Sequence, residues 1–151
     1  MAVSVALELP HDQSPAFTRA DLTFYGLDHS GPSYEARVFF DTPDATADTP
    51  LERAAGYVGS FTVFGHGGCF GEHGHCDVRG PVTAFDRRLP HQLVPASRVL
   101  LCTEALRARL GEGRDHVTVT VVPVVRDSPL ATAAQAEDVL QIDQVSLHTY
   151  E

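Results

Sequence analysis

Side chains that can bind a metal are concentrated in one glycine-rich segment, Gly65 to Asp77. Three of the chain's eight histidines and two of its three cysteines fall within eleven residues of this segment. Imidazole and thiolate are ligands that copper(I) and zinc prefer, and the soft mixture favours copper(I). Glycine reaches positive φ without steric cost, so ligands close in sequence can converge on one ion. The predicted metal ligands are His66, Cys69, His73, His75 and Cys76.

Acidic residues beside these ligands add a second possibility, which is catalysis. Glu72 or Asp77 could orient an imidazole by accepting its second N–H. With an open position on copper or zinc, the loop could activate water or oxygen, and Glu72 would be the nearest general base. Two other interpretations stay open, namely a loop of solvated histidines and a disulfide between Cys69 and Cys76. The spacing is not that of a zinc finger, because no second Cys-x-x-Cys pair completes one.

The remaining histidines and the third cysteine are predicted to have no chemical role. Cys102 lies in an apolar run, which is typical of a core thiol and not of a nucleophile. His91 and His116 lie beside predicted strand ends and are expected at the surface. No constellation of ligands surrounds the other three histidines, which are His11, His29 and His148.

Alternation of apolar and polar residues predicts that β-strands position the loop. The predicted strands are Val3–Leu9, Leu22–Leu27, Tyr34–Phe40, Tyr57–Phe64, Val82–Phe85, Arg98–Leu101, His116–Val125 and Val139–Tyr150. Gly59 inside the fourth of them indicates a β-bulge. The segment Asp41 to Ala55, rich in Pro, Asp and Thr, is predicted to be a long connection with a helical turn near Leu51 to Ala55.

One short helix is predicted over Thr103 to Leu110. Thr103 can cap its first turn, arginines suit its last turn, and Gly111 can end it. Seven or eight short strands with one short helix favour an all-β fold, an antiparallel β-sandwich, over a βαβ array. A length of 151 residues without linker or repeat predicts a single β-sandwich domain over 1–151, with the His/Cys-rich loop at 65–81.

Composition excludes several classes of partner. The formal net charge of −9 repels phosphate backbones, so no nucleic acid is expected to bind. All basic residues are arginine, which excludes Schiff-base and P-loop lysine chemistry and suggests a GC-rich bacterial genome. No apolar run approaches the roughly 20 residues of a membrane span, so no membrane is expected as a partner. The N-terminus lacks the basic region of a signal peptide, which with three cysteines predicts a reducing, cytoplasmic setting.

Four segments have a familiar order and spacing. They are Tyr34–Asp41, Gly56–Phe61, Val99–Val125 and Leu140–Leu147. Together they resemble the C-terminal β-sandwich domain of plant polyphenol oxidases. That domain is also found in bacterial tyrosinase-like proteins and, more distantly, in mollusc hemocyanins. The resemblance covers residues 34–148 of this chain.

The resemblance implies a covering role. In that family the sandwich packs over a separate helical domain that holds two type-3 copper ions, and it shields them from substrate. A cysteine motif in this region of some fungal tyrosinases is implicated in copper loading. By resemblance, Cys69 and Cys76 with the nearby histidines would deliver copper, and Phe70 would plug the partner's copper entrance. This sequence lacks the helical dicopper domain, so the resemblance implies either a partner that is a separate type-3 copper oxidase catalytic chain or a domain put to a new use.

Three functions therefore remain. The favoured one is an accessory subunit of a type-3 copper oxidase, not catalytic alone, that acts in shielding, maturation or copper delivery. The alternative is a stand-alone small copper or zinc metalloenzyme of bacterial secondary metabolism. The third is a purely structural interaction sandwich with a dispensable loop.

Overall fold

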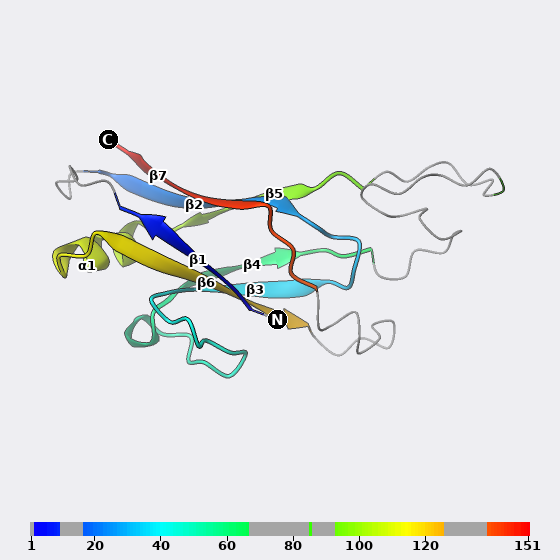
Figure 1. Ribbon diagram of the computed structural model, residues 1–151, viewed down its shortest axis with the longest axis horizontal. Coiled ribbons are helices and arrows are strands. Elements are labelled where there is room, and N and C mark those ends of the chain that lie inside the picture. Colours follow the sequence, from blue (N-terminus) through cyan, green and yellow to red (C-terminus); the bar gives the residue numbers. More distant parts are fainter. Residues whose placement is uncertain (1, 10–16, 67–84, 86–92, 126–138) are drawn as a thin grey trace.

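Two antiparallel sheets packed face to face make up the fold (Figure 1). The computed structural model describes residues 2–9, 17–66, 85, 93–125 and 139–151. The four-stranded sheet has the order β1 (Val3–Glu8), β6 (His116–Val125), β3 (Tyr34–Phe40) and β4 (Tyr57–Val63). The three-stranded sheet has the order β5 (Ala96–Leu101), β2 (Arg19–Leu27) and β7 (Gln144–Tyr150). The predicted β-sandwich is confirmed.

The strand predictions hold where alternation is strong. β3 and β6 have the predicted bounds, and along β1 every second residue is half-buried while its neighbours are exposed. Consecutive residues of β3 pair with Gly59 and Tyr57, so Val58 is the extra residue of a bulge beside that glycine. Of the predicted strand Val82–Phe85, residues 82–84 lie outside the described residues, and Phe85 is an exposed turn residue.

The last strand is shorter than predicted, because it begins at Gln144 and not at Val139. Residues 139–143 run beside the end of β2, where the N–H of Asp143 donates to the carbonyl of Tyr25 at 3.0 Å. Gly26 has a left-handed φ of 68°, which turns the β2 backbone at this point and interrupts a regular ladder. A Cβ on Gly26 would overlap the side chain of Asp143, so the two segments fit closely only because this residue is glycine.

The predicted helix is present as α1 (Thr103–Gly111), but its ends differ from the prediction. Thr103 is the first helical residue and not the cap, because its hydroxyl accepts the backbone N–H of Ala20 at 2.9 Å. At the other end the helix includes Gly111, and the left-handed residue that ends it is Gly113, with φ of 75°. The hydroxyl of Thr103, which was expected to cap the helix, is therefore used in a tertiary hydrogen bond to β2.

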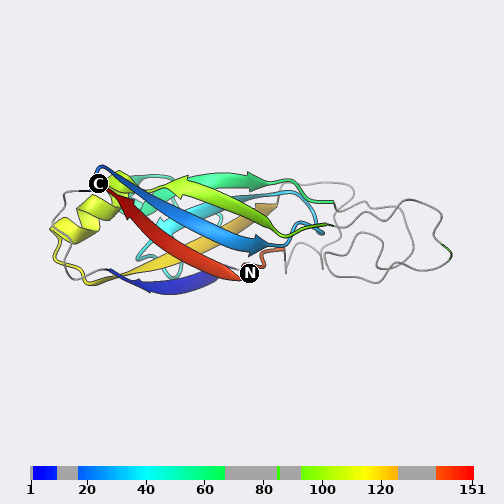
Figure 2. The same cartoon turned by 90° about the horizontal axis from the view of Figure 1, so that it is seen from above.

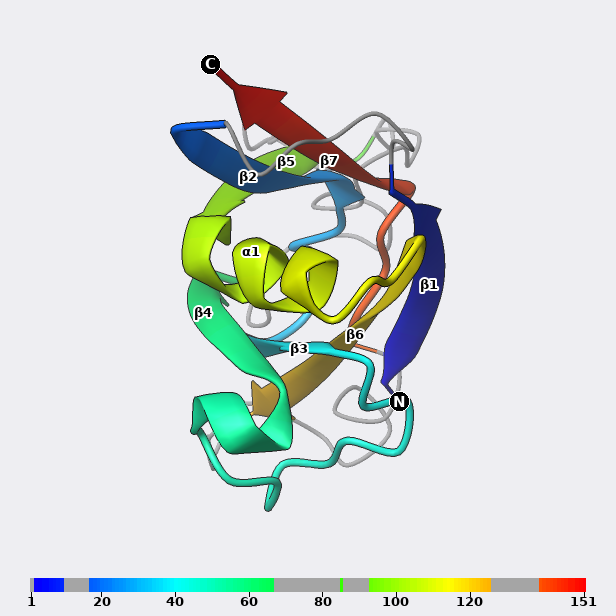
Figure 3. The same cartoon turned by 90° about the vertical axis from the view of Figure 1, so that its left-hand side faces the viewer.

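The main core lies between the sheets. Phe24 of β2 is fully buried and its ring lies 4.9 Å from that of Phe61 in β4, so it joins the two layers. Figure 3 shows α1 lying across one end of the sandwich, between the sheets. From this helix Leu106 is fully buried in the core, next to the buried Cys102. The helix therefore closes one end of the apolar layer.

The connection between β3 and β4 covers the outer face of the four-stranded sheet. It contains the short helix η1 (Arg53–Ala55), which confirms the predicted helical turn. A second apolar cluster forms where Ala45 of this connection packs on Phe39 and Val122, with Tyr57 beside them. Both faces of the central strands are thereby covered, which explains why β6 carries a run of β-branched residues rather than a strict alternation.

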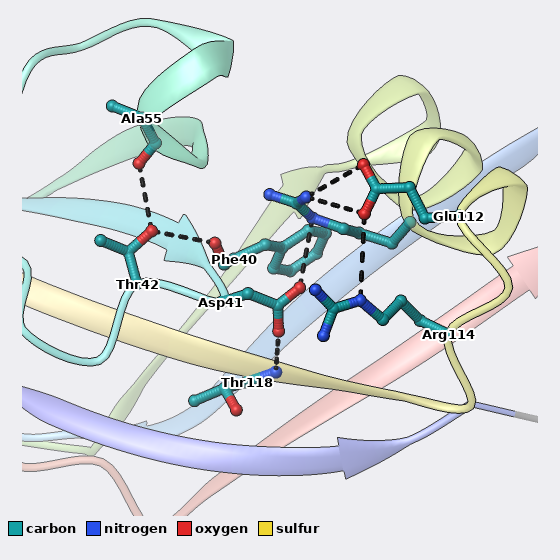
Figure 4. Close-up of polar contacts among 8 residues, drawn as sticks. Phe40, Asp41, Thr42, Ala55, Glu112, Arg114 and Thr118 are labelled. Atoms are coloured by element: carbon teal, nitrogen blue, oxygen red, sulfur yellow. Dashed lines mark hydrogen bonds and ion pairs between the residues drawn. The ribbon is translucent and has the colours of Figure 1, made fainter.

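Asp41 joins β3, β6 and α1 at the helical end of the sandwich (Figure 4). It is the one described residue other than glycine with a positive φ, at 52°. Its Oδ1 accepts the N–H of Thr118 at 2.9 Å, and its Oδ2 lies 3.2 Å from Nε of Arg109. Arg109 also pairs with Glu112 at 3.1 Å. One carboxylate thus ends a strand, completes the neighbouring ladder and anchors the helix.

Replacement of Asp41 tests this junction. Asp41→Ala leaves the part-buried N–H of Thr118 without its acceptor and puts alanine at a left-handed position. We expect it to lower the free energy of unfolding by about 2 to 3 kcal/mol. Asp41→Asn keeps the acceptor and tolerates that backbone, so it should lose only the partly buried ion pair, about 1 kcal/mol or less. Denaturant unfolding measures both, and equal losses would contradict the role given to the backbone and Thr118.

Candidate metal centre

β4 ends at the end of the sandwich opposite α1 (Figures 1 and 2), and the first predicted ligand, His66, comes shortly after it in the chain. His66 follows β4 by three residues and is half-buried, and its Nδ1 is buried. Glu72 and Phe70 lie outside the described residues. So do the other four predicted ligands, which are Cys69, His73, His75 and Cys76. Their convergence on one ion therefore stays a prediction.

Backbone contacts fix the position of His66. Its N–H donates to the carbonyl of His29 at 2.8 Å, and the N–H of Gly65 donates to Oγ of Ser33 at 2.9 Å. A Cβ on Gly65 would overlap the carbonyl of Gly31 and the backbone of Pro32. Glycine is therefore required where the segment after β4 crosses the segment between β2 and β3, and the close approach holds the two segments together.

His29 is a functional candidate that the sequence analysis missed. It was expected to have no constellation around it, but its ring centroid lies 5.1 Å from that of His66, with the planes at 70°. Nε2 of His29 lies 2.8 Å from the carbonyl oxygen of Val94. A carbonyl only accepts, so this contact needs a proton on Nε2 and leaves Nδ1 of the neutral ring as the basic nitrogen. No local sequence pattern predicts this pair, because the two histidines are 37 positions apart in the chain and only the packing of the fold brings them together.

Asp28 and Arg98 are charged groups of the described residues near this end. The carboxylate of Asp28 accepts the N–H of Ser30 at 2.7 Å, which forms a tight turn around His29. Burial raises the pKa of Tyr34 to about 12, with a further increase from Asp28 and an opposing effect of Arg98. Tyr34 therefore stays neutral at physiological pH, and the negative charge of Asp28 favours a cation nearby.

Cys102 is separated from this chemistry, as predicted. It is 2% exposed and packs in the main core, and burial, with a smaller contribution from Asp21, raises the pKa of its thiol to about 12. Because the thiolate is the form that binds metal or attacks as a nucleophile, Cys102 is inert at neutral pH. Among the described residues no group of three or more His, Cys, Asp and Glu side chains could hold a metal ion. His116 is exposed and hydrogen-bonded to Asp115, which confirms its surface position.

A pocket of about 110 Å³ at the α1 end differs in its chemistry from the histidine end. Phe40, Tyr57 and the side chains of Arg53, Arg109 and Glu112 line it, with small residues of α1 and Gly56. These lining residues offer no imidazole or thiol to a metal. The end that carries His29 and His66 is therefore the better candidate for a metal centre.

Comparisons with known proteins identify the fold. No protein-family model and no curated protein matches the sequence. Among solved structures, latent aurone synthase (a polyphenol oxidase) from its natural source matches 99% of this chain, with a TM-score of 0.57 and 18% identity. The recombinantly expressed enzyme matches 98% of it, with a TM-score of 0.54 and 17% identity. The chain has the fold of a polyphenol-oxidase segment.

This polyphenol-oxidase-like sandwich covers 24% of each of those longer chains. The whole of the present chain is thus aligned with a quarter of the enzyme, which agrees with the resemblance to the C-terminal polyphenol-oxidase domain. At this level of identity the comparison establishes the fold, and function depends on the site. No helix among the described residues is long and apolar enough to cross a membrane.

Substitution of Gly65 tests whether the crossing of the two segments is tight. In Gly65→Ala the new methyl group would overlap backbone atoms of Gly31 and Pro32, so the segments must separate. We expect the free energy of unfolding to fall by about 1 to 3 kcal/mol, and NMR contacts between the rings of His29 and His66 to disappear. Gly31→Ala is the matched control, because nothing lies within 4 Å of its Cβ position. Equal stability of both variants would contradict the tight crossing.

Proposed function

We propose that this protein is an accessory domain of a type-3 copper oxidase, which it covers and supplies with copper(I). The observation that supports the proposal is the alignment of the whole chain with a quarter of a latent polyphenol oxidase. In this proposal the sandwich binds a catalytic chain that carries the copper pair.

The copper part of the proposal rests on the set of metal-binding side chains that begins at His66. Two thiols and three imidazoles stand within eleven residues after a strand whose end is held by backbone contacts. Thiolates hold copper(I) firmly yet exchange it between ligand sets, which suits transfer to a partner. This role requires reduced Cys69 and Cys76, and we therefore place the protein in a reducing compartment such as the cytoplasm.

Copper uptake tests the role of the loop. The purified, reduced protein should bind about one copper(I) per chain, and changing both Cys69 and Cys76 to serine should weaken binding about a hundredfold or more, because the soft ligands are lost. Competition with a chromophoric copper(I) chelator under anaerobic conditions measures the affinity. Cys102→Ala is the matched control and should leave copper binding unchanged, since that thiol is buried and protonated. No uptake by the parent protein would refute copper delivery.

Partner capture tests the covering role. A tagged copy expressed in its own host should co-purify with a chain that contains a type-3 copper centre, identified by mass spectrometry and metal analysis. Phenol oxidation by the captured complex should rise when the sandwich is removed, because the copper entrance is then open to substrate. Capture of a chain without such a centre, or turnover of phenols by the isolated copper-loaded sandwich, would refute this role and favour a stand-alone metalloenzyme.

A further inference from the structure

The imidazoles of His29 and His66 come from different sheets. His29 follows β2 of the three-stranded sheet, and His66 follows β4 of the four-stranded sheet. Their rings nevertheless lie 5.1 Å apart, and a backbone hydrogen bond of 2.8 Å joins the two residues directly. The close approach of the Gly65 backbone to the carbonyl of Gly31, which leaves no room for a side chain, adds a second restraint. The pair is therefore built into the frame of the sandwich.

The environment of His29 is that of a metal-ligating histidine. Such residues donate one ring N–H to a carbonyl or carboxylate, which fixes the tautomer and directs the other nitrogen at the metal. Nε2 of His29 has this partner in the carbonyl of Val94, at 2.8 Å. Its Nδ1 is then the nitrogen with an available lone pair in the neutral ring. The carboxylate of Asp28, one residue earlier, adds negative charge that favours a bound cation.

The separation of the rings fits a shared ion. A metal about 2.0 Å from an imidazole nitrogen lies about 3.2 Å from the ring centre, and in a tetrahedral site completed by two further ligands two such centres lie about 5.2 Å apart. The observed separation of the His29 and His66 centroids is 5.1 Å.

We propose that His29 and His66 supply two imidazole ligands of a copper(I) site at the base of the loop, with Nδ1 of His29 as one ligand. This inference rests on the proposed copper-handling function and extends it. The site is weaker than the thiolates of the loop, because imidazole is a harder ligand for copper(I). It provides a fixed position on the sandwich to which the loop passes its ion.

The test uses the full chain with Cys69 and Cys76 changed to serine, so that imidazole binding is measured alone. This chain should still bind copper(I), supplied as its acetonitrile complex, and the further change His29→Gln should weaken binding about tenfold or more. Glutamine keeps an N–H for the carbonyl of Val94 and removes the imidazole, so a merely structural role of His29 would leave the affinity unchanged. His148→Gln, at an exposed position of β7, is the matched control and should have no effect.

A second measurement reports the ligand directly. Addition of copper(I) to the same double-serine chain should shift the ¹⁵N resonance of His29 Nδ1, and the shift should be absent for His148. Equal copper affinity of the His29→Gln and His148→Gln variants, or an unmoved His29 resonance, would overturn the two-imidazole site. If the parent protein with both thiols still binds copper in that case, the proposed function stands. If the parent binds none, copper handling fails as a whole.

Discussion

The burial of one apolar layer between two sheets is the interaction on which the rest of the structure depends. Backbone ladders pair strands only within each sheet, so no ladder joins β2 to β4. Fully buried side chains such as Phe24 and Val119 join the sheets instead, and the Phe24 ring packs on Phe61 across the layer. The neighbourhood of His29 and His66 follows from this packing, because each histidine extends from a different sheet.

The two ends of the sandwich have different roles. At one end α1 closes the core with Leu106, and Asp41 fastens the helix to β3 and β6 through Arg109 and Thr118. At the other end the chain passes from β2 to β3 and leaves β4 toward the His/Cys-rich loop. A rigid frame that presents its reactive residues on connections at one end is a common arrangement for binding sites.

The fold and the function rest on different kinds of evidence. Alignment of nearly the whole chain with a quarter of a polyphenol oxidase establishes the architecture, at 18% identity. A β-sandwich by itself carries no particular activity, so the proposed role depends on the ligands after β4 and on the histidine pair at their base. The described histidines are consistent with metal binding in their geometry, their tautomer and the charge of Asp28.

The sequence alone determined the elements and their buried faces. Alternation set the bounds of β3, a β-branched run set those of β6, Gly59 marked the bulge in β4, and an apolar context identified Cys102 as a core thiol. Only the tertiary structure decided which ends lie together. In the structure the hydroxyl of Thr103 contacts β2 and does not cap the helix, and β7 begins at Gln144 and not at the predicted Val139. The structure also places His29 beside His66. The physical reason is that a local pattern records which side of a strand avoids water, whereas the packing of the two sheets selects the neighbours of each strand end.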